Sequence, residues 1–244
     1  MGVAERRERE RAERRAAILQ AAGRVLDADG FDGMTMDTVA SAAELSKGTL
    51  YLYFRSREAL IAAIGEQRLR GMAESLRRRL PEAINGLDGV RIILETYANH
   101  FSRSHCRFAL GWISSNAADD DSLPSFVAYR ERLGTIVAMV IATIERGRRD
   151  ETIRSEVDPK MAAMLLWGEF LGVAIVNLNR HRMRTRLPQY SFDVNGLFSA
   201  HVEGVLRKLA APGVDIPEVE GLAFPAEVDP DPDRSKVWRR EVGT

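Results

Sequence analysis

The sequence predicts an all-α protein with eight to ten helices and no strands. Apolar residues recur three and four positions apart along nearly the whole chain, which is the spacing of a helix face that packs on a core. No segment alternates strictly between apolar and polar residues, as a half-exposed strand would. The chain has 244 residues, 45% of them apolar and 29% charged, so it can bury a core and has the composition of a globular protein.

Charge and cysteine content narrow the class of protein. Thirty-five basic and thirty-five acidic residues give a net charge of zero, which argues against a bulk polycation but leaves room for a local DNA-binding patch. A single cysteine, Cys106, allows no intrachain disulfide and is typical of a reducing cytosol. Residues 1–15 contain six arginines, four glutamates and no apolar run. We therefore expect a cytoplasmic protein with no secretory signal and a flexible charged arm over residues 1–11.

The N-terminal part begins with one amphipathic helix, followed by two short helices. The stripe of the first helix runs from Ile18 to Leu26 and ends at Asp29-Gly30. Thr35 is a good N-cap for the second helix, and Ser46 for the third, which reaches Phe54. Two short helices joined by a turn of three or four residues form a helix-turn-helix, whose second helix fits the major groove of DNA.

The helix that follows Ser46 carries the polar groups that DNA binding requires. Its first turn offers unpaired backbone N–H groups to phosphates, and Gly48, a poor helix former, suggests a close approach to the backbone. Tyrosine hydroxyls and arginines follow along the same helix. Taken alone, the helical spacing of Tyr51 and Tyr53 favours core aromatics, and Lys47, Arg55 and Arg57 could belong to a solvated face.

The run from Glu44 to Leu60, ELSKGTLYLYFRSREAL, closely resembles the signature of TetR-family regulators, as do the segments 15–22, 30–31 and 35–40. The resemblance covers residues 12–72 and implies a three-helix domain that contacts double-stranded operator DNA. Arg57 stands where the family usually has lysine. Leu52 fills a position that is often aromatic or polar, so we expect it to touch a thymine methyl, a sugar or nothing. The implied DNA contacts are Thr35, Ser46, Lys47, Gly48, Thr49, Tyr51, Leu52, Tyr53, Arg55 and Arg57.

Further helices follow in residues 73–210, which the resemblance marks as a ligand-binding and dimerisation domain. Ile93 begins an apolar stripe after a break at residues 86–89, and a long helix starts near Pro124. A last amphipathic helix runs from Val194 to Leu209. Residues 211–244 hold five of the nine prolines and an excess of acidic residues, so we expect a loosely ordered tail.

The segment from Met161 to Leu178 is apolar enough to cross a membrane, but Glu169 lies near its middle and no second such segment exists. We expect a soluble helix that is packed on both sides. The resemblance implies that this helix and the last one form a four-helix dimer interface, and an internal core helix of a monomer is the alternative. Glu169 then needs a partner, either a ligand or an arginine across the dimer. The candidate interface residues are Leu165, Gly168, Glu169, Gly172, Val202, Val205 and Leu206.

The resemblance also implies a small-molecule effector bound in the larger domain. The abundance of aromatic residues favours an apolar ligand, although each candidate could be plain core. The candidate pocket residues are Tyr97, Phe101, His105, Phe108, Trp112, Tyr129, Met139, Trp167 and Phe170.

Together these features predict a homodimeric repressor that a small apolar ligand releases from a palindromic operator. An activator or a ligand-independent regulator of the same fold remains an alternative, as does a helical protein-interaction scaffold. We do not expect an enzyme, a cofactor or a metal, because no phosphate-binding glycine loop is present and His100 and His105 are wrongly spaced for a metal pair.

Overall fold

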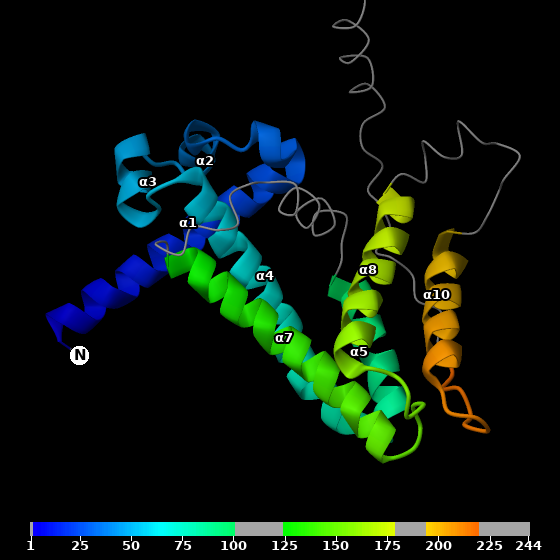
Figure 1. Ribbon diagram of the computed structural model, residues 1–244. Coiled ribbons are helices and arrows are strands. Elements are labelled where there is room, and N and C mark those ends of the chain that lie inside the picture. The colour runs from blue at the N-terminus through cyan, green and yellow to red at the C-terminus, as the bar shows by residue number, and fades with distance from the viewer. Residues whose placement is uncertain (1, 101–123, 179–193, 220–244) are drawn as a thin grey trace, which may run out of the picture.

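The computed structural model describes residues 2–100, 124–178 and 194–219. Within these ranges the chain is helical, and its sole β-type pairing is an isolated antiparallel bridge between Ile153 and Ala210. The all-α prediction is therefore confirmed. The described helices are α1 (Val3–Gly33), α2 (Met36–Ala42), α3 (Lys47–Tyr53), α4 (Arg57–Arg79), α5 (Gly86–His100), α7 (Pro124–Arg149), α8 (Pro159–Leu178) and α10 (Val194–Leu209), with a 3-10 turn at Leu80–Glu82 (Figure 1).

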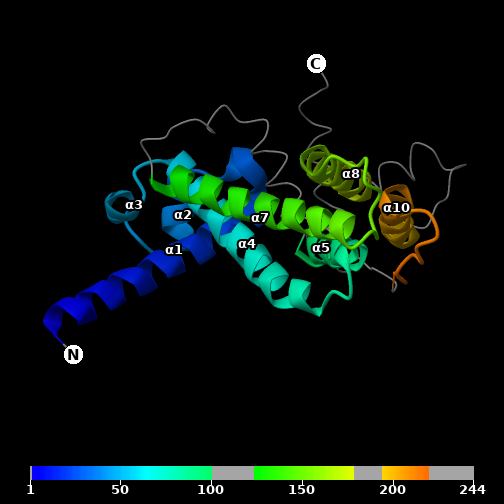
Figure 2. The same ribbon diagram turned by 60° about the horizontal axis from the view of Figure 1, so that its bottom comes forward.

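Helix α1 is longer than the apolar stripe that predicts it. It begins at Val3, so the described part of the expected arm, residues 3–11, is helical and exposed. Figure 2 shows this N-terminal half of α1 projecting away from the rest of the chain. At the other end, Gly30 adopts φ 74° and ψ −170°, a conformation open to glycine. The helix is interrupted there, as the Asp29-Gly30 signal predicts.

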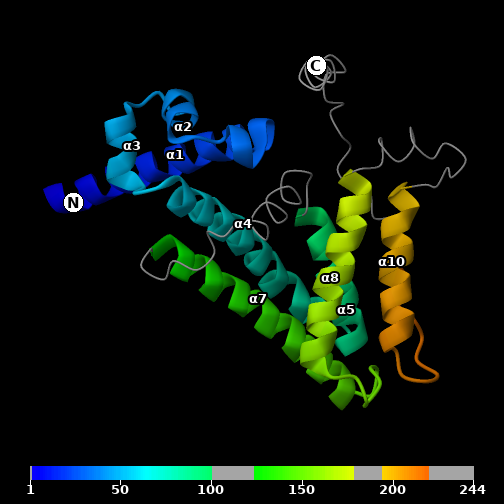
Figure 3. The ribbon, with the colours of Figure 1, turned by 45° about the horizontal axis from the view of Figure 1, so that its top comes forward.

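The helices pack around two hydrophobic cores. The smaller core joins α1, α2 and α3 to the first half of α4, from Leu60 to Ile64. The larger core holds the second half of α4, including Met72 and Leu76, together with α5, α7, α8 and α10. Figure 3 shows α4 leading from one end of the molecule to the other. Helix α4 therefore belongs to both cores.

Helix α7 runs alongside α4 and also contributes to both cores (Figures 1 and 3). Near its start, Phe126 is 1% exposed and packs into the smaller core, whereas Ile136, Val140 and Ile144 pack into the larger one. An ion pair between Arg132 and Glu66, 3.3 Å apart, ties the two helices midway. The DNA-binding domain predicted as residues 12–72 thus needs a side chain from α7 to complete its core.

Helix α5 starts at Gly86, so the break expected at residues 86–89 is wrong. A Cβ atom on Gly86 would lie 2.1 Å from the backbone of Gly147, which means that α5 and α7 touch through their backbones. The Gly86 N–H donates to the Asp150 carboxylate over 2.8 Å, and the Leu87 N–H donates to the Thr152 hydroxyl over 3.2 Å. Glycine therefore permits a close helix contact here, and a distant segment caps the helix.

The chain packs beyond the domain boundary that the sequence predicts at residue 210. The Arg154 side chain donates from Nε to the carbonyl oxygen of Ala210 over 2.8 Å. Val214, Ile216 and Val219 then pack against the larger core. The first nine residues of the expected tail therefore belong to the larger domain.

Candidate nucleic-acid interface

Helix α3 separates its buried and exposed side chains sharply. Leu50 and Phe54 are 0% and 2% exposed and anchor the helix in the smaller core, at the i, i+4 spacing of one helix face. On the outer side, Leu52 is 76% and Tyr51 is 44% exposed. A large apolar side chain exposed to this extent on a short helix is available to a partner.

The N-termini of α2 and α3 have the caps that the sequence predicts. The Thr35 hydroxyl accepts the Thr38 N–H over 3.1 Å, and the Ser46 hydroxyl accepts the Thr49 N–H over 3.1 Å. The Ser46 and Thr49 hydroxyls also lie 2.8 Å apart. These caps fix where both helices begin, so the turn between them is set by side chains of the helix-turn-helix itself.

Lys47, at the start of α3, reaches back to α2. Its Nζ lies 2.8 Å from a carboxylate oxygen of Asp37, and both side chains are exposed. The hydrogen bond to Asp37 and the negative charge of that residue raise the pKa of Lys47 above its usual value. Lys47 is therefore charged at neutral pH and is held at the exposed end of the recognition helix. Nothing local in the sequence marks Asp37 as a partner, because it lies ten residues before Lys47 and meets it only in the fold.

Gly48 lies in open space. A Cβ atom at this position would meet only the Ser46 hydroxyl oxygen, at 3.9 Å. The internal packing of the chain therefore does not require glycine there. The open surface leaves room for another molecule to approach the backbone of α3 closely.

Tyr53 and Arg57, two of the predicted DNA contacts, also make contacts within the protein. Tyr53 is partly buried and packs against the smaller core, so it combines a structural role with its place at the edge of the exposed face. Arg57 donates from Nε to the carbonyl oxygen of Met34 over 2.6 Å and from a second nitrogen to the carbonyl oxygen of Phe31. These bonds turn the Arg57 side chain towards the end of α1 and give it a structural role, while its expected contact with DNA stays a prediction. Arg55 is exposed, as predicted.

Some pocket candidates are core residues of the larger domain. The rings of Tyr97 and Phe170 meet edge to face at 5.4 Å, and those of Phe170 and Phe198 at 5.5 Å. Burial raises the pKa of the Tyr97 hydroxyl. Met139 and Trp167 are partly buried. The other candidates, Phe101, His105, Phe108 and Trp112, lie outside the described residues.

Tyr129 lies at the end of α7 that meets the DNA-binding helices. It packs against the smaller core next to the position of Phe126, because this end of α7 reaches the DNA-binding helices. Burial raises the pKa of Tyr129 to about 12. The place of Tyr129 in a ligand pocket stays a prediction.

Among the described residues, helix α8 packs on one side only. Phe170 and Ala174 are fully buried, whereas Met161, Met164 and Leu165 are 62%, 59% and 47% exposed. The glycines expected at an interface, Gly168 and Gly172, continue this exposed face, and a Cβ atom on either would meet nothing within 4 Å. In the described residues, α8 is the one helix long and apolar enough to span a membrane, over Pro159–Val176, with 28% of that stretch buried.

The interface residues predicted on α10 are buried, unlike those predicted on α8. Val202, Val205 and Leu206 are at most 3% exposed because they pack into the larger core of their own chain. Their assignment to a surface between two chains is therefore wrong.

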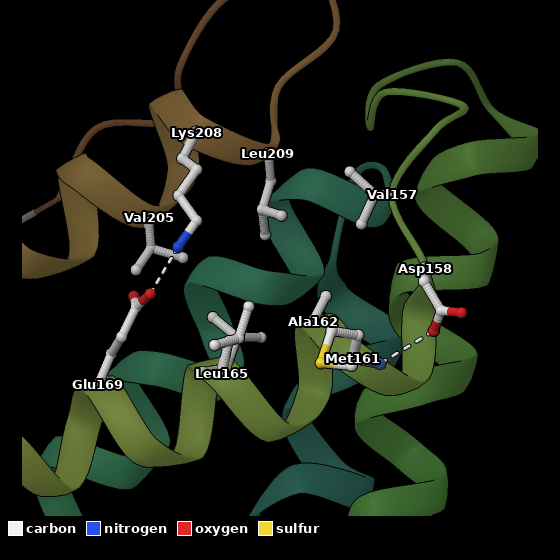
Figure 4. A pocket seen from close by; sticks show the side chains of 10 residues that line it. Val157, Asp158, Met161, Ala162, Leu165, Glu169, Val205, Lys208 and Leu209 are labelled. Atoms are coloured by element: carbon white, nitrogen blue, oxygen red, sulfur yellow. Dashed lines mark hydrogen bonds and ion pairs between the residues drawn. The ribbon is translucent and has the colours of Figure 1, made fainter.

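Glu169 also differs from the prediction, since its side chain is 35% exposed and its carboxylate lies 2.5 Å from Nζ of Lys208. Its partner is thus on α10 of the same chain. Figure 4 shows this pair closing one side of a groove of about 210 Å³ between α8 and α10.

A capped helix-turn-helix with an exposed second helix defines a DNA-binding protein. Residues 18–64 match the family model described as bacterial regulatory proteins, tetR family, which covers α2, α3 and parts of α1 and α4. Over these DNA-binding helices the chain is similar to the TetR family of transcriptional regulators.

Two relatives support this at the level of sequence. The HTH-type transcriptional regulator YvdT of Bacillus subtilis is 40% identical over 63 residues, which are 26% of this chain and 32% of YvdT. The A-factor receptor protein of Streptomyces griseus is 21% identical over 199 residues, which are 81% of this chain and 64% of the receptor. The matched region thus spans less than two thirds of either relative.

Solved structures share the fold over most of the chain. FadR from Bacillus subtilis, in complex with stearoyl-CoA, superimposes with a TM-score of 0.58 and 15% identity over 78% of this chain and 97% of its own. AibR, in complex with isovaleryl coenzyme A and operator DNA, gives a TM-score of 0.56 and 19% identity over 82% of this chain and 99% of its own. At 15% and 19% identity these superpositions establish the fold alone. They cover the larger domain as well as the helix-turn-helix.

Proposed function

We propose that this regulator is a cytoplasmic homodimeric repressor that leaves a palindromic operator when a small molecule binds its larger domain. The observation that carries the proposal is the exposed face of α3. Leu52 and Tyr51 point outward from a helix whose other side is locked in the core by Leu50 and Phe54. Such a helix can enter the major groove without unfolding anything.

On this proposal the DNA contacts divide by chemistry. Leu52 meets base edges or thymine methyl groups, and Gly48 lets the start of α3 approach the duplex. Lys47, Tyr51 and Arg55 bind phosphates, as does the outer edge of Tyr53, and the capped turns at Thr35, Ser46 and Thr49 lie beside the backbone. Phosphate contacts position the protein on DNA, whereas sequence preference comes from the few residues that reach base edges.

Dimerisation is proposed to use the exposed face of α8. Met161, Met164, Leu165, Gly168 and Gly172 follow one another at helical spacing, and the two glycines allow a second helix to come close. A twofold dimer presents two α3 helices symmetrically, and half-sites about 34–36 Å apart then read a palindrome.

The effector is proposed to carry an apolar acyl group. FadR and AibR, which share the fold, are described in complex with stearoyl-CoA and isovaleryl coenzyme A. Helices α4 and α7 belong to both hydrophobic cores, so a ligand that shifts the larger core also moves the base of the DNA-binding helices. A coupling free energy of about 1–3 kcal/mol between effector and operator is enough for such release.

The test is selection of genomic fragments by the purified protein, followed by titration of the best fragment with salt. A palindromic fragment, bound with a steep loss of affinity as salt rises, supports the proposal. Stearoyl-CoA and isovaleryl-CoA are then added to the complex, and release of DNA supports the effector class. No enrichment over random DNA would contradict operator binding, and a complex that survives both thioesters would contradict the acyl effector.

A further inference from the structure

The N-terminal half of α1 is a charged helix with a great deal of exposed surface. Residues 3–17 are all exposed, and at 1.5 Å per residue they extend about 22 Å. This part of the helix adds nothing to the smaller core, whose α1 residues begin at Ile18. Its length and charge are therefore not explained by the packing of the DNA-binding domain.

Five of the six arginines of this arm fall into two groups. Arg6 and Arg9 lie 3.6 Å and 3.9 Å from the carboxylates of Glu10 and Glu13, one turn further on. Arg7, Arg11 and Arg14 follow the i, i+4, i+7 pattern, which places them in one row along the helix. Within the described part of the chain, none of these three forms an ion pair. The row therefore has positive charge available for a partner.

This arginine row lies next to the recognition helix. Arg7, Arg11 and Arg14 line a hollow of about 680 Å³ together with Tyr53, the last residue of α3, and Ala17, Glu10 and Glu13 complete its lining. The Arg15 guanidinium lies 4.9 Å from the centre of the Phe54 ring, which fixes the arm against the end of α3. Figure 3 shows α3 ending beside α1, with the arm continuing beyond it.

We propose that the row formed by Arg7, Arg11 and Arg14 binds the phosphate backbone of DNA beside the groove that α3 occupies. The inference rests on the proposed function, because it needs α3 on DNA. A guanidinium presents several N–H donors in a flat fork that matches phosphate oxygens, and an unpaired exposed row loses no internal ion pair when it binds. The arm then extends the DNA footprint outward and adds affinity that does not depend on base sequence.

The test compares the full chain with the variant R7A/R11A/R14A on the fragment that the wild type selects. Alanine preserves the helix, which circular dichroism checks. Each arginine that contacts a phosphate should lower the slope of log affinity against log salt by about 1, so the triple variant loses up to about 3 per protomer. Hydroxyl-radical protection at the outer edges of the footprint should also disappear, while the preferred sequence stays the same.

Two control variants separate the effect of charge from the effect of position. R7K/R11K/R14K keeps the charge and should keep most of the slope. R77A/R148A/R149A removes three exposed arginines from the far ends of α4 and α7, and should bind as the wild type does. An unchanged slope and footprint in R7A/R11A/R14A would overturn this inference while operator binding stands, and so would an equal loss in R77A/R148A/R149A. A wild type that selects no DNA would overturn the proposed function and this inference together.

Discussion

The Arg57 guanidinium donates to the carbonyl oxygen of Met34 over 2.6 Å, so the first residue of α4 is fastened to the residue that ends α1. A second nitrogen of Arg57 holds the carbonyl oxygen of Phe31. Because α4 continues into the larger core, this contact links the base of the helix-turn-helix to the part of the chain where an effector would bind. A displacement of α4 must therefore move the DNA-binding helices or break these bonds.

Arg57→Ala should lower the free energy of unfolding by about 1–3 kcal/mol, because two backbone carbonyl groups lose a charged donor. Urea denaturation measures the loss. Arg55→Ala, two residues earlier and exposed, should leave stability unchanged and weaken DNA binding. If Arg57→Ala instead keeps its stability and shows a shallower salt dependence on DNA, Arg57 binds phosphate after all.

Lys47→Ala should weaken operator binding on the order of tenfold and leave the thermal midpoint where it is, because the Lys47–Asp37 pair is exposed. Fluorescence anisotropy with labelled DNA measures the first effect and calorimetry the second. Asp37→Asn serves as the counterpart, since it releases Lys47 without removing its charge and should not weaken binding. A drop in stability for Lys47→Ala would point to a core role instead.

Leu52→Ala and Leu50→Ala form a matched pair on the same helix. Leu50 is fully buried, so its truncation should cost about 2–5 kcal/mol of stability. Leu52 is 76% exposed, so its truncation should change stability by less than about 0.5 kcal/mol and relax the base preference at one position of each half-site. Selection of randomised sites by both proteins reads out the preference, and identical selected sequences would remove Leu52 from the set of base-reading residues.

The charged double variant M164E/L165E should be monomeric in analytical ultracentrifugation, because it puts two carboxylates on the exposed face of α8. Ile84→Glu is the control, since Ile84 is 86% exposed and belongs to the connection before α5, not to α8. It should sediment as the wild type does. An M164E/L165E protein that remains dimeric would move the interface elsewhere.

Asp150 should make the cap of α5 sensitive to acid. Burial alone would raise the pKa of Asp150, but hydrogen bonds from the Thr152 hydroxyl and the Gly86 and Thr152 N–H groups, with the charge of Arg146, outweigh it and lower the pKa. A lowered folded-state pKa contributes stability that is present above the unfolded value of about 3.9 and is lost as pH falls through the folded value. Wild type should therefore be more stable than Asp150→Asn at pH 7, and the gap should begin to narrow near pH 4 and close only once the pH falls below the folded-state pKa. Parallel curves in urea titrations across this range would contradict the role.

Local signals predicted the helix-turn-helix well. The caps at Thr35 and Ser46 and the apolar stripe from Leu50 to Phe54 act over one or two turns, so they can be recognised in the sequence. The kink at Gly30 follows from the same local logic, since glycine alone tolerates that backbone conformation easily. Helical periodicity likewise located α7, α8 and α10.

The errors all depend on contacts between distant segments. The sequence predicts a break at Gly86 because it cannot show that the backbone of Gly147 packs against that residue. It likewise cannot show that Arg57 reaches the carbonyl oxygen of Met34. The stripe of α10 predicts burial of Val202, but it cannot say whether the covering helix comes from the same chain or from another. For Tyr129, nothing in its own helix tells which of the two cores it meets.

The position of Phe126 determines which fragments of the protein can keep a complete smaller core. It comes from α7, more than fifty residues after the end of the helix-turn-helix, yet it fills the core beneath that motif. A fragment that ends at residue 72 would keep all the side chains of α3 but would lose Phe126. An apolar cavity would then remain in the smaller core. The DNA-binding helices therefore do not form a complete core by themselves. A fusion that transfers them to another protein must include the start of α7.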